Sequence, residues 1–72
     1  MEPREVERIE RLTGSHLELR HLWSEHRALE AELAALDQRR YLTPEEEQRR
    51  KELQKAKLAG RDRIQAILDE QR

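Results

Sequence analysis

The chain has 72 residues, of which 43% are charged, and its 15 Lys and Arg nearly balance its 16 Asp and Glu to give a net charge of −1. It contains no cysteine, which excludes disulfide bonds and thiolate metal sites. No segment approaches the roughly 18 consecutive apolar residues of a membrane span, so we expect a cytoplasmic protein with no membrane contact.

The composition favours helix almost throughout, because Ala, Leu, Glu, Arg, Gln and Lys dominate and few residues are β-branched. Eleven Leu and three Ile provide most of the large apolar side chains, which is enough for a narrow core only. Chains this short often complete their core with a partner surface. We therefore expect a single all-α domain over residues 1–72 that forms a homo-oligomer.

The first predicted element is a short helical arm over residues 3–13. Pro3 suits the first turn of a helix, and Val6, Ile9 and Leu12 recur at every third position. Gly14 follows as a plausible C-terminal stop.

A long helix is predicted over residues 15–40. Ser15 and Glu18 have the spacing of a capping box, in which each side chain binds the backbone N–H of the other residue. Apolar positions then alternate in steps of three and four, which is the heptad pattern of paired helices. This seam consists of Leu19, Leu22, His26, Leu29, Leu33 and Leu36.

The third predicted element is a helix over residues 44–70. Thr43, Pro44 and Glu46 form the typical start of a helix, with a second capping box. The same heptad spacing recurs at Leu53, Lys57, Gly60, Ile64 and Ile67. A link of only three or four residues forces the two long helices to run antiparallel. The fold predicted is an antiparallel, coiled-coil-like helical hairpin with an N-terminal arm.

Residue numbers that sum to about 84 should lie opposite each other across this hairpin, given the common rise of about 1.5 Å per residue. Leu19 is then expected near Ile64, Trp23 near Gly60, and His26 near Lys57. His26 and Lys57 would form a polar layer in the seam. Two cations there would repel each other and lose solvation, so we expect a lowered pKa for His26.

The sequence gives no support for catalysis, a cofactor or a metal site. His16, His21 and His26 are five residues apart, so they diverge around a helix and cannot share one ion. Ser24, Glu25 and His26 are consecutive, and consecutive helical side chains point in different directions, so they cannot form a catalytic chain. We expect a protein that is not an enzyme.

Several apolar side chains have no place in the seam, and we expect them to form an interaction surface. They are Trp23, Leu58, Val6, Ile9 and Leu12. Two hairpins could bury them by packing into a four-helix bundle. Alternatively, the arm could fold back and cover them within one chain. The favoured function is a helical interaction module that self-associates or binds an unidentified protein partner.

Charge is distributed unevenly along the chain. Residues 49–63 contain seven basic and two acidic residues, whereas residues 1–36 contain five Arg and eight Glu. A basic stripe suggests weak nucleic-acid binding as an alternative function, with phosphate contacts from Arg49, Arg50, Lys51, Lys55, Arg61 and Arg63. The interpretation we favour is that the acidic and basic helices attract each other across the hairpin.

Two segments of the chain resemble the YdcH-like family of small bacterial proteins. They are the stretch from Leu22 to Glu30, which contains the aromatic-x-x-His motif of Trp23 and His26, and the stretch from Leu53 to Ile64. The resemblance covers roughly residues 16–68. It implies a helical hairpin in the bacterial cytoplasm and no established biochemical activity.

Overall fold

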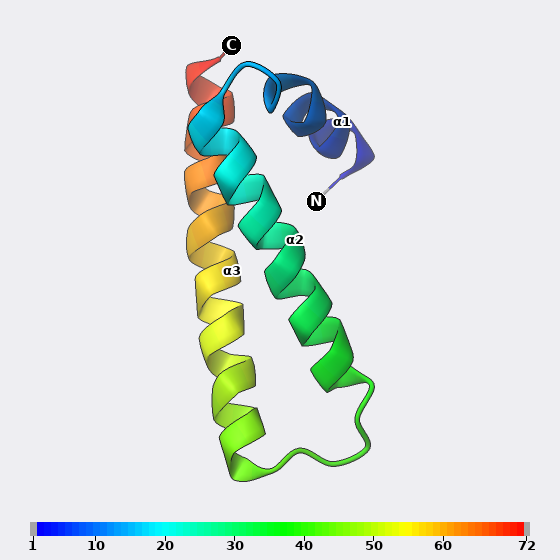
Figure 1. Cartoon of the computed structure of the whole chain (residues 1–72). Helices are drawn as coiled ribbons and strands as arrows, with labels where there is room; N and C mark the ends of the chain where they lie inside the picture. Colours follow the sequence, from blue (N-terminus) through cyan, green and yellow to red (C-terminus); the bar gives the residue numbers. More distant parts are fainter. Residues whose placement is uncertain (1, 72) are drawn as a thin grey trace.

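The computed structural model describes residues 2–71 and contains three helices, α1 (Pro3–Leu12), α2 (Leu17–Asp37) and α3 (Pro44–Glu70). The two long helices run antiparallel side by side, and α1 lies beside the start of α2, near the C-terminal end of α3 (Figure 1). The described residues contain no strand. The predicted all-α hairpin with an N-terminal helical arm is therefore confirmed.

The start of α3 is built as the sequence predicts. The Thr43 hydroxyl accepts a hydrogen bond from the backbone N–H of Glu46 at 3.1 Å, and the Glu46 carboxylate accepts one from the backbone N–H of Thr43 at 3.0 Å. Pro44 occupies the first turn, where its missing N–H would have no helical partner. The bond from the Thr43 backbone lowers the pKa of the Glu46 carboxyl, because it stabilises the charged form.

The start of α2 differs from the prediction, because the capping box of Ser15 and Glu18 does not form. His16 is the N-cap, and its Nδ1 accepts a hydrogen bond from the backbone N–H of Leu19 at 3.2 Å. The Ser15 hydroxyl instead donates to the carbonyl of Leu12 at 3.3 Å. This bond ties Ser15 to the turn that closes α1, so α2 begins only at Leu17.

The arm ends near its predicted stop, although not through a left-handed glycine. The first helix ends at Leu12, and Thr13 follows it in a right-handed conformation. No described glycine has a positive φ. The Thr13 hydroxyl donates to the Glu10 carbonyl at 2.8 Å and so satisfies one of the free carbonyls at the end of α1.

The connection between the long helices is longer than predicted, because α2 ends at Asp37 and not at residue 40. Residues 38–43 form the link, which is tied to α3 by an ion pair between Arg39 and Glu46. Six residues reach at most about 20 Å, whereas the 21 residues of α2 span about 32 Å. The antiparallel arrangement therefore still follows.

The predicted seam forms the core of the hairpin. All eleven of its positions are buried or partly buried. Leu19 and Ile64 lie in one cluster, as the register predicts, together with Ile67 and with Leu68, which the heptad pattern omits. Leu33 and Leu53 are buried nearer the loop, outside this cluster. The core is therefore dense at the end where α2 begins and thinner toward the loop.

The arm folds back onto this dense end. Ile9 has no exposed surface and belongs to the cluster of Leu19 and Ile64, and Leu12 and Trp23 pack against the cluster with part of their surface exposed. The Arg8 guanidinium donates to the carbonyl of Leu68 at 2.7 Å, in the last turn of α3. Ile9 is thus a core residue within one chain, which corrects its predicted place on an intermolecular surface.

Replacement of Ile9 by Ala tests the docking of the arm. We expect a loss of about 2–5 kcal/mol in unfolding free energy, because the change leaves a cavity among buried side chains. Urea denaturation followed by the fluorescence of Trp23, the only tryptophan, measures it. The control is Leu17→Ala, at a side chain that is 60% exposed, which should change stability by less than about 0.5 kcal/mol. Equal effects of the two changes would contradict the docking of α1.

Candidate interaction surface

The five apolar residues predicted to form an interaction surface separate into two groups. Ile9 is fully buried, and Val6, Leu12 and Trp23 are partly buried, so α1 and the dense end of the core account for them. Leu58 is 59% exposed, near the middle of α3. Leu58 is therefore the member of the predicted set that remains available to a partner.

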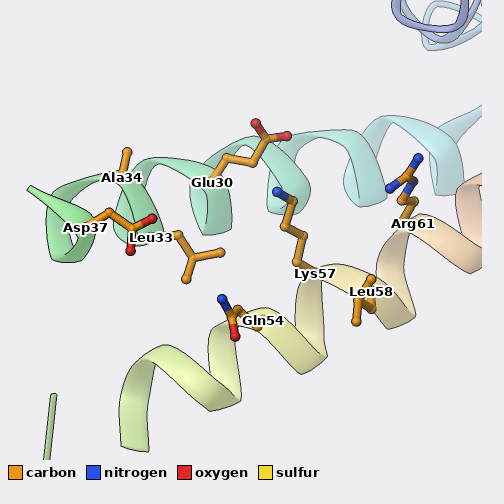
Figure 2. A pocket seen from close by; sticks show the side chains of 8 residues that line it. All are labelled: Glu30, Leu33, Ala34, Asp37, Gln54, Lys57, Leu58 and Arg61. Carbon is orange, nitrogen blue, oxygen red and sulfur yellow. The ribbon is translucent and has the colours of Figure 1, made fainter. Parts of the chain in front are cut away.

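Leu58 lines a groove between α2 and α3 with a volume of about 440 Å³ (Figure 2). Leu33, Ala34 and Leu58 give the groove its apolar surface. The remaining lining side chains are Glu30, Asp37, Gln54, Lys57 and Arg61.

The two walls of the groove differ in charge. The acids, Glu30 and Asp37, both belong to α2, and the cations, Lys57 and Arg61, both belong to α3 (Figure 2). The groove is therefore acidic along one wall and basic along the other. No sequence pattern predicted this groove, because its position depends on the distance between α2 and α3 in the folded chain.

A polar layer lies in the seam beside this groove. His26 is only 3% exposed, and its Nε2 contacts the Glu30 carboxylate at 2.5 Å. The imidazole stacks on the Trp23 ring, with the ring centroids 5.6 Å apart. Nδ1 of His26 is buried without a hydrogen-bond partner among the described residues. The sequence predicted the burial of His26 in the seam but missed its partners Glu30 and Trp23.

Burial lowers the pKa of His26, because the imidazolium ion loses its solvation. The Glu30 carboxylate opposes this shift and the positive charge of Lys57 adds to it. The direction agrees with the sequence-based expectation, although desolvation contributes more than the repulsion from Lys57.

The lowered pKa of His26 predicts that stability falls with acid. The unfolded chain binds a proton at this residue more readily than the folded chain does, so the unfolding free energy should decrease as pH drops through about 6.5, the ordinary pKa of histidine. Denaturation between pH 7.5 and 5.5 measures the slope, and an NMR titration should place His26 below that value. His26→Phe keeps an aromatic ring beside Trp23 and should remove this part of the slope. An unchanged slope in the variant would contradict the prediction.

Three of the seven basic residues in the stripe of α3 form ion pairs with α2. Arg63 donates two hydrogen bonds to the Glu18 carboxylate at 2.8 and 2.9 Å. Similar contacts join Arg49 to Glu32 at 3.3 Å and Arg50 to Asp37 at 2.9 Å. The interpretation that the acidic and basic helices attract each other is therefore supported.

These ion pairs also affect the charged groups themselves. The Arg63 guanidinium lowers the pKa of the Glu18 carboxyl, mainly through their hydrogen bonds.

The other three predicted phosphate contacts are exposed and form no ion pair with any residue of the described chain. They are Lys51, Lys55 and Arg61. Three of the six predicted contacts thus remain free for a ligand.

Residues 2–71 contain neither a metal-binding cluster nor a membrane-spanning helix. No group of three or more His, Cys, Asp or Glu side chains there is arranged to hold a metal ion. Within the same residues, no helix is both long and apolar enough to cross a membrane.

A protein-family model described as "Protein of unknown function (DUF465)" matches residues 19–68, which include most of α2 and α3. The chain belongs to this family. DUF465 is the YdcH-like family, so the resemblance seen in the sequence is confirmed. No curated protein and no solved structure is significantly similar to the chain.

The DUF465 region begins at Leu19 and ends at Leu68, two residues of the dense core cluster. The first helix lies outside this region and supplies Ile9 to the same cluster. In this chain, therefore, a segment outside the family match covers the apolar end of the DUF465 hairpin. The groove around Leu58, nearer the loop, lies wholly within the matched residues.

Proposed function

We propose that this DUF465 protein is a non-enzymatic helical interaction module that acts by self-association. The observation that carries the proposal is the exposure of Leu58, which is 59% accessible beside an open groove. The other exposed large apolar side chains, Leu17 and Tyr41, lie at the start of α2 and in the link, away from this groove. Burial of a leucine is worth about 1.5–3 kcal/mol, so its exposure in the middle of α3 favours a partner.

The thin core near the loop supports the same proposal. At the other end, α1 packs on Leu19 and Ile64 and completes the core within one chain. Toward the loop, Leu33 and Leu53 are buried by the two long helices without a third helix. A second helical layer there would add apolar contacts that the single hairpin lacks.

The contents of the groove suit binding better than catalysis. Its lining includes no hydroxyl, thiol or imidazole that could act as a nucleophile with a neighbouring base. Both acids are already engaged, Glu30 with His26 and Asp37 with Arg50. A surface of opposed charges around a leucine is typical of helix pairing.

Size-exclusion chromatography with light scattering tests self-association. We expect a mass above that of one chain at micromolar concentration. Leu58→Glu should shift the protein toward the monomer, because it places a charge in the contact. Leu17→Glu is a matched control, since Leu17 is 60% exposed and lies outside the groove. This control should keep the wild-type mass.

Two results would contradict this proposal. One is a wild type that stays monomeric up to high micromolar concentration. The other is an equal decrease in the mass of the assembly for Leu58→Glu and Leu17→Glu, which would indicate a general effect of the added charge.

Nucleic-acid binding remains a second candidate, because Lys51, Lys55 and Arg61 are exposed around Leu58. Titration of labelled duplex DNA and of RNA at 50 and 200 mM salt tests it. Three phosphate contacts would weaken duplex affinity by roughly fortyfold between these concentrations. Any affinity that the wild type shows should be lost when all three residues are changed to Gln. We expect no binding, since the groove has no aromatic ring for base stacking.

A further inference from the structure

We infer that two copies of this chain pair groove to groove, with their two-fold axis parallel to the long helices. The inference rests on the proposed self-association, and it specifies which surface forms the contact and how the two copies are oriented. Its basis is the arrangement of the groove, in which the acidic wall belongs to α2 and the basic wall to α3 (Figure 2).

Two simple ways exist to bring the grooves of two identical hairpins face to face. A two-fold axis parallel to the helices places α2 of one copy opposite α3 of the other. An axis that lies in the interface but runs across the helices places α2 opposite α2 and α3 opposite α3. Both arrangements are closed dimers with self-complementary contacts.

Charge separates these two arrangements. With the parallel axis, Glu30 of each copy faces the basic wall of the other copy near Lys57, whereas Asp37 lies nearer the loop, about 15 Å along the helix from the level of Lys57. With the transverse axis, acids face acids and cations face cations. Like charges brought together at an interface are unfavourable, so the parallel axis is preferred.

The parallel axis also keeps every residue at its own level along the hairpin. Residues opposite each other within one chain have numbers that sum to about 84, and the ion pairs between the long helices agree, since Arg63 pairs with Glu18 and Arg49 with Glu32. Lys57 of one copy then lies within about one helical turn, or about 5 Å, of the level of Glu30 of the other. Both side chains are long enough to cover that offset.

The apolar residues favour the same pairing. In this arrangement, α2 of one copy covers Leu58 of the other. The side of the groove that contains Leu33 and Ala34 is covered by the same contact. Each long helix gains a second antiparallel neighbour, which completes a four-helix bundle. The docked arm lies near the C-terminal end of α3 (Figure 1), and none of its residues lines the groove.

Chemical cross-linking tests the geometry directly, because the natural chain has no cysteine and each introduced one is unique. Ala34→Cys labels the α2 side of the groove and Gln54→Cys labels the α3 side, and both positions are exposed. The two full-length variants, one with an affinity tag, are mixed and treated with a short bismaleimide. Circular dichroism confirms that each variant is folded. We expect the mixed product to form several-fold faster than either product of two identical chains.

A matched control places the cysteine outside the groove. Leu17→Cys introduces a thiol at a position about as exposed as Leu58, and it should give only the slow cross-linking of random encounters. Arg61→Glu reverses one charge of the basic wall and should weaken dimerisation by roughly three- to tenfold. Arg20→Glu makes the same charge change at an exposed residue outside the groove and should leave dimerisation unchanged.

The outcomes separate this inference from the proposed function. Dominant cross-linking of Gln54→Cys with itself would indicate the transverse axis and overturn the inference, while self-association would stand. A dimer by light scattering with no cross-linking above the Leu17→Cys control would place the contact on another surface and would also overturn it. A wild type that is monomeric would remove both the inference and the proposed function.

Discussion

Packing at the dense end of the hairpin depends on the burial of Ile9 against Leu19 and Ile64, because a chain of 72 residues has few large apolar side chains to spare. Helix α1 covers this end of the hairpin, and a hydrogen bond from Arg8 to the Leu68 carbonyl joins it to the last turn of α3. The small number of large apolar side chains also explains the thin core at the loop end of the hairpin. With no third helix near the loop, Leu33 and Leu53 form a thin core, and Leu58 stays exposed beside the groove.

Ion pairs between the two long helices favour one register of the antiparallel hairpin. The pairs Arg63 with Glu18 and Arg50 with Asp37 join a basic helix to an acidic one. Each pair is exposed and so contributes little to stability, yet together they favour one register. The same asymmetry gives the groove walls of opposite charge, which is the property that would let two identical surfaces complement each other.

The polar layer connects the core to the groove. His26 is buried in the seam, while its partner Glu30 lies on the acidic wall. Removal of this partner would leave a second imidazole nitrogen without a hydrogen bond, in addition to Nδ1. A buried polar group of this kind costs stability and favours one alignment of the helices over its neighbours. The pH dependence of unfolding is therefore a measure of this layer.

The sequence by itself determined the helical class, the antiparallel hairpin, the start of α3 and the seam, because heptad spacing and capping are local and periodic. It did not determine the start of α2, where His16 replaced Ser15 as the cap, since competition between neighbouring side chains for the same turn depends on their geometry. Only the tertiary structure decided that Ile9 lies inside one chain and that Leu58 lies beside a groove. Periodicity shows which face of a helix is apolar, whereas the neighbour that covers that face depends on how the loops direct the helices in space.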